Sequence, residues 1–189
     1  MQVVSAIKFA SFFVALVPIF AGEPEIKDLI RVDANVYRGR QPGDESFATL
    51  AQMGVKTVID LRGGSIHAPR EKKLVEKAGM RYVVEGVSGI FPPRDEQIAR
   101  LLAVMRDPAA VPVFVHCKRG ADRSGVLIAC YRMVRYGWTN QQALDEARAD
   151  RFSSLEVLMR RYIRRFDPAR LNIPVDAPAV AADGHLLLM

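Results

Sequence analysis

A cysteine and an arginine stand six positions apart in one short segment that also contains glycine and serine. The segment reads His116-Cys-Lys-Arg-Gly-Ala-Asp-Arg-Ser-Gly125, with Cys117 and Arg123 as the pair. A cysteine thiolate is a strong nucleophile, and an arginine guanidinium can hold two oxygens of an oxyanion at once. These residue types at this spacing predict attack on a bound tetrahedral oxyanion, and phosphate is the natural candidate. Attack by the sulfur forms a cysteinyl-phosphate, which water then hydrolyses.

The segment lies between a predicted buried strand and a predicted buried helix. Residues 111–115 form a short apolar run, and residues 126–134 are apolar nearly all round. A loop that enters a helix N-terminus offers unpaired backbone N–H groups and a partial positive charge, which together bind anions. Gly120 permits the backbone angles of such a tight loop. The segment therefore predicts a phosphate cradle that favours the thiolate form of Cys117.

The other residues of this signature loop have supporting roles in the prediction. Ser124 can donate a hydrogen bond to the cysteine sulfur and help it to leave in the second step. His116 is expected to order the loop through hydrogen bonds instead of acting as a base. The remaining positions, which we expect to contact phosphate through backbone or cationic side chains, are Lys118, Arg119, Gly120, Ala121 and Gly125.

The pattern His116-Cys117-x5-Arg123-Ser124 resembles the signature of the cysteine-dependent protein tyrosine phosphatase superfamily. Upstream, residues 35–42 and 55–62 are similar to the opening segments of small bacterial and plant-type dual-specificity phosphatases. Together the match spans Leu29 to Phe166. The resemblance implies a general-acid aspartate, which protonates the leaving oxygen and usually comes from a separate upstream loop.

The sequence departs from the family in this acid loop. Residues 86–93 keep two adjacent prolines but contain no aspartate before them. Asp122, inside the signature loop, is the substitute that we favour, because the loop itself fixes its distance from Cys117. Myotubularins and some secreted bacterial lipid and tyrosine phosphatases are similar in having a loop aspartate. A salt bridge to a nearby arginine is the alternative role for Asp122. Asp95 is the alternative acid, and an N-terminal helix cap would also explain it.

Several further side chains bear on the chemistry. Arg62 ends a predicted strand at the edge expected to hold the site, where it either contacts substrate or caps an acidic neighbour. Arg38 is interpreted as structural. Cys130 falls inside the buried helix and is interpreted as a small hydrophobe, so the two cysteines predict no disulfide framework. The three histidines lack metal-ligand spacing, and the loop and Arg123 already supply positive charge, so no metal or cofactor is expected.

Length and composition predict one main domain with additions at both ends. The chain has 189 residues and a formal net charge of +6, which suits an anionic phosphorylated substrate, and it contains no nucleic-acid-binding motif. An uncharged apolar run over residues 9–21 follows Lys8 and is too short to span a bilayer comfortably. We expect residues 1–22 to be a signal peptide for export to the periplasm or medium, or else an uncleaved membrane anchor. Residues 23–167 are the expected phosphatase domain, and residues 168–189 a loosely attached tail.

The order of elements predicts the fold. Strands alternate with helices along residues 26–134, which indicates an α/β fold with a mainly parallel central sheet and helices on both faces. A last helix is predicted over residues 154–166. Its expected inward stripe is Leu155, Leu158, Tyr162 and Phe166, and its four arginines face outward. A solvated helix face is the preferred interpretation of these arginines, and contact with a membrane surface or an acidic substrate is the alternative.

Four functions remain open at this point. The leading hypothesis is a metal-independent phosphomonoesterase for phosphotyrosine or mixed phosphoprotein substrates, acting as a monomer. The second is the same chemistry on phosphoinositides or inositol phosphates, which Asp122 and the basic loop rim favour. The third is a sulfurtransferase of the rhodanese type, against which the spacing of Cys117, Arg123 and Ser124 argues. The fourth is a non-catalytic phosphate-binding module.

Overall fold

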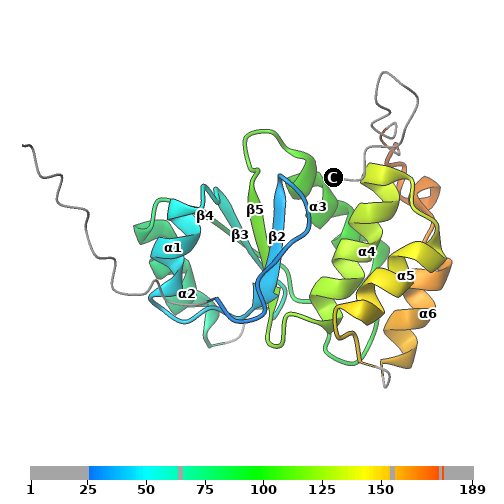
Figure 1. Cartoon of the computed structure of the whole chain (residues 1–189), viewed down its shortest axis with the longest axis horizontal. Helices are drawn as coiled ribbons and strands as arrows, with labels where there is room; N and C mark the ends of the chain where they lie inside the picture. The colour runs from blue at the N-terminus through cyan, green and yellow to red at the C-terminus, as the bar shows by residue number, and fades with distance from the viewer. Residues whose placement is uncertain (1–25, 64–65, 154–155, 175, 177–189) are drawn as a thin grey trace, which may run out of the picture.

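The computed structural model describes residues 26–63, 66–153, 156–174 and 176, and its centre is a five-stranded sheet (Figure 1). The spatial order of the strands is β1-β2-β5-β3-β4. Only β1 runs antiparallel to its neighbour, and the other pairings are parallel. The strands are β1 (Ile30–Arg31), β2 (Val36–Arg40), β3 (Thr57–Asp60), β4 (Arg81–Val84) and β5 (Val113–Cys117).

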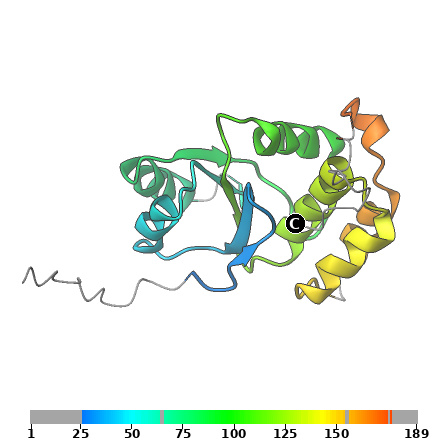
Figure 2. The ribbon, with the colours of Figure 1, turned by 45° about the horizontal axis from the view of Figure 1, so that its top comes forward.

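Helices cover both faces of this sheet (Figure 2). Alternate side chains of a strand point to opposite faces, so β5 contributes to two apolar clusters. Phe114 packs with one pair of helices, whereas Val113 and Val115 pack with the remaining four. On the first face lie α1 (Ser46–Gln52) and α2 (Ala68–Lys77). On the second lie α3 (Asp95–Arg106), α4 (Asp122–Tyr136), α5 (Asn140–Ala149) and α6 (Val157–Arg165). The predicted α/β fold with a mainly parallel sheet is confirmed.

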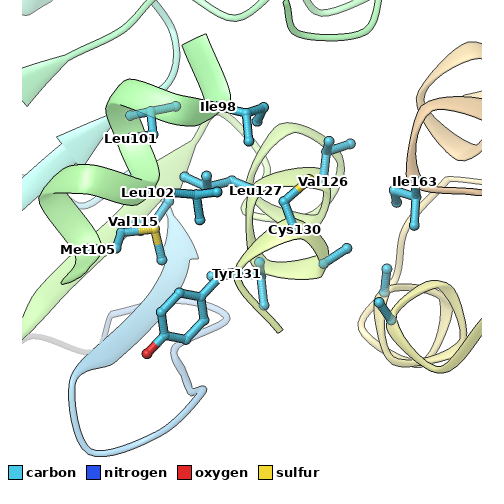
Figure 3. Close-up of a cluster of buried hydrophobic side chains, with 14 of the residues drawn as sticks. Ile98, Leu101, Leu102, Met105, Val115, Val126, Leu127, Cys130, Tyr131 and Ile163 are labelled. Atoms are coloured by element: carbon cyan, nitrogen blue, oxygen red, sulfur yellow. The ribbon is translucent and has the colours of Figure 1, made fainter. Parts of the chain in front are cut away.

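Helix α4 is the centre of the larger cluster. It carries apolar residues on all sides, as the sequence predicts, and residues 124–134 are all buried between the sheet, α3, α5 and α6. Figure 3 shows Val126, Leu127 and Cys130 of this helix among apolar side chains of its neighbours. Burial on every side holds the helix firmly against β5, and the loop between these two elements is the signature loop.

The predicted inward stripe of the last helix was wrong. Met159 and Ile163 are the buried residues of α6, while Leu158 is exposed and Tyr162 is only half-buried. Phe166 is buried as expected, because it follows the end of α6 in an extended conformation and turns back to the core. Arg161, Arg164 and Arg165 are exposed and Arg160 is half-buried; Leu155 lies outside the described residues.

The two predicted additions to the domain are described only in part. Residues 1–22, predicted as a signal peptide or anchor, lie outside the described residues. In the predicted tail, a short 3-10 helix (η1) covers Pro168–Leu171. Leu171 and Ile173 pack against the larger cluster, and Asp176 pairs with Arg106 of α3 and Arg135 of α4. Within the described residues, each helix is too short or too polar to cross a bilayer.

Candidate active site

The signature loop joins the carboxyl end of β5 to the N-terminus of α4. Cys117 is the last residue of β5, and Asp122 is the first residue of α4. Cys117 is buried, and its Sγ lies 3.7 Å from Ser124 Oγ in the first turn of the helix. The sulfur therefore faces the end of a helix where backbone N–H groups are unpaired and the partial charge is positive. This is the arrangement that the spacing predicted for a phosphate cradle.

The loop is tight because it rests on the end of β2. Gly120 has a φ of +70°, which glycine adopts far more readily than other residues. A Cβ at this position would lie 2.4 Å from the carbonyl carbon of Gly39 and 2.5 Å from the nitrogen of Arg40. No side chain fits there, so Gly120 is needed both for its backbone angles and for this close approach.

Arg123 lies in the first turn of α4 and is half-buried. Its Nη1 donates to the carbonyl oxygen of Leu61, at a distance of 3.5 Å. Leu61 directly follows β3, which neighbours β5 in the sheet. The guanidinium is therefore held at the same sheet edge as the signature loop.

Asp122 has both carboxylate oxygens engaged. Arg119 donates to Oδ2 at 2.5 Å, and the backbone N–H of Ser153 donates to Oδ1 at 2.8 Å. The carboxylate is buried, while the Arg119 side chain is 61% exposed. The structure thus contains the salt bridge that the sequence left open for Asp122, within the loop that holds Cys117.

Asp95, the alternative acid, contacts a different part of the molecule. Its Oδ1 accepts a hydrogen bond from the hydroxyl of Tyr162 in α6, at 2.8 Å, and its Oδ2 pairs with Arg170 at 3.1 Å. The interpretation of Asp95 as the N-terminal helix cap was wrong, because the cap is the preceding residue, Arg94. The extended Arg94 is the N-cap, because its N–H donates to the side chain of Gln97 and Asp95 already has helical geometry.

A buried network of charges holds the residue before the nucleophile. His116 is 0% exposed and lies on the sheet face opposite to that of Cys117, because successive strand residues alternate. Its Nε2 is 2.7 Å from Glu71 Oε1, and Glu71 in turn pairs with Arg62. Arg62 also pairs with Asp60 at 2.8 Å. His116 therefore lies in the core of the opposite face and is poorly placed to act as a base on Cys117.

The same network explains the position of Arg62. Burial alone would raise the pKa of Asp60, but hydrogen bonds from Arg62 hold this pKa below its usual range. Of the two roles that the sequence left open, Arg62 has the contact with acidic neighbours. Asp60, Glu71 and His116 are close enough together to suggest metal ligands, but the Arg62 guanidinium already supplies the positive charge that the carboxylates need. The sequence reasoning missed Asp60 and Glu71, which come from separate elements.

The two cysteines should differ sharply in reactivity. Cys130 is 0% exposed, and burial raises the pKa of its thiol well above its usual range, so it stays a neutral hydrophobic group (Figure 3). We expect iodoacetamide near neutral pH to modify Cys117 and to leave Cys130 unmodified in the folded protein. Peptide mass spectrometry after timed quenching measures this, and inorganic phosphate should slow the reaction. Modification of Cys130 at a comparable rate would contradict the assignment.

Comparison with known proteins identifies the class to which this site belongs. A family model described as a DSP-PTPase phosphatase fused to NAD+ kinase matches residues 9–165. The dual-specificity protein phosphatase TpbA of Pseudomonas aeruginosa strain UCBPP-PA14 is 33% identical over 132 residues, which cover 67% of this chain and 55% of TpbA. The inositol diphosphatase SIW14 of Saccharomyces cerevisiae is 27% identical over 142 residues, which cover 72% of this chain and 50% of SIW14. The chain thus spans about half the length of these relatives.

Solved structures agree with the sequence comparison. The crystal structure of P. aeruginosa TpbA has a TM-score of 0.64 and 27% identity, covering 77% of this chain and 88% of TpbA's. The core catalytic domain of SIW14 is similar in fold, with a TM-score of 0.68, 24% identity and coverage of 77% and 89%. The chain belongs to the cysteine-based dual-specificity phosphatases of the protein tyrosine phosphatase superfamily.

Proposed function

We propose that this protein is a metal-independent phosphomonoesterase that acts on phosphotyrosine or mixed phosphoprotein substrates. In the first step Cys117 Sγ attacks the phosphorus atom. The S–P bond forms as the bond to the leaving oxygen breaks, and Asp122, which takes part in its protonated form and released from Arg119, gives its proton to that oxygen. Backbone N–H groups of the loop and the Arg123 guanidinium hold the three remaining phosphate oxygens.

The second step releases phosphate. A water molecule attacks the phosphorus and gives a proton to Asp122, while the S–P bond breaks and its electron pair returns to Cys117. Ser124 donates a hydrogen bond to the departing sulfur, which makes the thiolate a better leaving group. After this step the enzyme has regained both the thiolate and the proton on Asp122.

The observation that carries the proposal is the position of Cys117. It ends β5 directly before the first turn of α4, next to Ser124, and Gly120 keeps the intervening loop tight. A variant of the relative TpbA has been solved in complex with phosphotyrosine, which favours this substrate class. The same arrangement argues against a non-catalytic binding module, because such a module needs neither a nucleophile nor a leaving-group donor.

A second candidate function is the hydrolysis of inositol phosphates or phosphoinositides. A groove of about 520 Å³ lies beside the signature loop and contains four cationic side chains. These are Lys27, Arg40, Lys118 and Arg119. Arg40 pairs with Asp28 and Arg119 with Asp122, so the two lysines carry most of the argument that the groove suits a substrate with several phosphates. The relative SIW14 is named an inositol diphosphatase.

A substrate panel tests both functions. Purified protein lacking residues 1–21 is assayed for phosphate release from phosphotyrosine peptides, phosphoserine peptides and inositol polyphosphates. We expect the highest kcat/KM on phosphotyrosine peptides, and a preference for inositol polyphosphates of tenfold or more would favour the second function. Formation of thiocyanate and sulfite from thiosulfate and cyanide, with no phosphate release, would instead indicate a sulfurtransferase.

A pair of lysine variants shows whether the groove selects the substrate. Lys27→Gln removes a groove cation, whereas Lys56→Gln removes an exposed lysine that precedes β3, at the opposite edge of the sheet. If polyphosphates use the groove, Lys27→Gln should lower the ratio of kcat/KM for inositol polyphosphate to that for phosphotyrosine peptide by about fivefold. Lys56→Gln should leave this ratio unchanged. Equal ratios in both variants would mean that the groove does not select the substrate.

Export and assembly are also part of the proposal. The apolar run at residues 9–21 favours export, or anchoring if it is not cleaved, and the protein would then act outside the cytoplasm as a monomer. The exposed arginines of α6 form a solvated helix face, and contact with an anionic membrane surface is the alternative role.

A further inference from the structure

Arg38 is a buried cation with donors that the fold does not use. Its side chain is 1% exposed, and its Nε and Nη1 are buried without a hydrogen-bond partner. Buried polar groups normally have partners, and a buried unpaired donor costs free energy. Packing alone therefore does not explain why a charged side chain with unpaired donors is buried at this position.

The strand register places Arg38 on the same face of the sheet as the nucleophile. Arg38 of β2 is paired with Val115 of β5, and Arg40 is paired with Cys117. Val36 and Val115 both belong to the larger apolar cluster, which also contains Cys117. Side chains of one register row share a face, so the Arg38 side chain extends into that cluster, between β2 and the start of α4.

The guanidinium ends beneath the first turn of α4. A Cβ added to Gly125 would lie 3.9 Å from Arg38 Nη1, and Gly125 is the residue after Ser124, whose Oγ contacts the Cys117 sulfur. The negative charge of Cys117 also acts on Arg38, because it opposes the effect of burial on the pKa of Arg38, and screening by water is weak in the protein interior.

The partners that Arg38 does have compensate its charge only in part. Nη2 donates to the backbone carbonyl of Asp150 at 3.0 Å, and the Asp150 carboxylate lies 3.5 Å away. The Asp150 side chain is 25% exposed, so water weakens this pair. Burial lowers the pKa of Arg38, and the negative charges of Asp150, Glu146 and Cys117 oppose this effect.

We propose that Arg38 is a positioning residue whose buried charge stabilises the Cys117 thiolate from inside the core. The loop N–H groups and Arg123 act on the phosphate side of the sulfur, whereas Arg38 acts from the sheet side. The charged groups around the pair are Glu146 of α5, Asp150 and Arg151 directly after this helix, and Asp122 and Arg123 of α4. The inference rests on the proposed function only for the role of Cys117 as nucleophile.

Alkylation of Cys117 by iodoacetamide tests this proposal without any turnover. The reagent is neutral, so its own attraction to Arg38 does not enter the rate. In Arg38→Met we expect the rate constant at pH 6 to fall about tenfold, because less of the thiol is ionised. At pH 10, above the usual pKa of a cysteine thiol, the two rate constants should converge. Arg38→Lys keeps the charge and should recover most of the loss.

A second variant should raise the alkylation rate of Cys117 instead of lowering it, and the substitution does not disturb the core. Asp150→Asn removes the carboxylate that competes for Arg38, so alkylation of Cys117 at pH 6 should accelerate about threefold. The matched control is Asp145→Asn, an exposed carboxylate inside α5 that pairs with Arg148, and its rate should equal that of the wild type. If Arg38→Met does not fold, this pair of variants decides the question. Unchanged or slower alkylation in Asp150→Asn, or an unchanged rate at pH 6 in folded Arg38→Met, would overturn the proposal.

Phosphatase assays of the same variants separate this inference from the proposed function. If none of the proteins releases phosphate but the alkylation rates follow the expected order, the proposed function fails and the role of Arg38 stands. If phosphate release is normal and the alkylation rates do not change, the proposed function stands and the role of Arg38 fails.

Discussion

Cys117→Ser should abolish phosphate release while the protein still binds phosphate. A serine hydroxyl is ionised far less than a thiol, and His116 cannot activate it because it faces the opposite side of the sheet. We expect kcat on phosphotyrosine peptides to fall by a factor of at least about 10⁴. The loop N–H groups and Arg123 remain, so titration calorimetry should give a Kd for phosphotyrosine peptide within about threefold of the wild-type KM.

The matched control is Cys130→Ser, which alters the other cysteine 13 positions later. This change places a hydroxyl in an apolar site, so it should lower the free energy of unfolding by about 1–3 kcal/mol and leave kcat within a factor of about two. If Cys117→Ser retained the wild-type rate, another residue would be the nucleophile and the assignment of the whole loop would be wrong.

The local parts of this site are predictable from the sequence because they are contiguous. Strand, loop and helix follow one another over residues 113–136, and the positions of Cys117, Gly120 and Ser124 follow from the geometry of one strand-to-helix turn. The alternation of strands and helices likewise predicts the parallel sheet and its two covered faces. In these regions neighbours in sequence are neighbours in space.

The parts that sequence reasoning missed are brought together by the sheet. Arg40 lies beside Cys117, and Arg38 beneath the start of α4, only because β2 pairs with β5 in one particular register. Glu71 reaches His116 from α2, on the other face. Local sequence gives no signal for these contacts, so Arg38 was interpreted as structural and Asp60 and Glu71 received no role.

The error in α6 has a different cause. Two overlapping helical stripes of this segment are apolar, one through Leu158 and Tyr162 and the other through Met159 and Ile163. Spacing alone does not choose between them. The structure buries the second stripe against α4 and α5, while the Tyr162 hydroxyl donates a hydrogen bond to Asp95, the first residue of α3.

Asp122→Asn should give the second-largest loss of activity, and the loss should depend on the leaving group. An asparagine oxygen can still accept the N–H of Ser153, so the loop should keep its shape. The amide carries no acidic proton, however, and cannot protonate the leaving oxygen. General acids contribute about 10²–10⁴-fold, so we expect kcat on phosphotyrosine peptides to fall by about 10²-fold or more.

p-Nitrophenyl phosphate is the informative second substrate, because its leaving group departs readily without a proton. On this substrate Asp122→Asn should lose less than about tenfold. Asp95→Asn is the matched variant, since it also neutralises a carboxylate that begins a helix and pairs with an arginine. If Asp95→Asn shows the dependence on leaving group and Asp122→Asn does not, Asp95 is the acid. The Asp122 carboxylate then serves only to hold Arg119 and the backbone of Ser153 beside the loop.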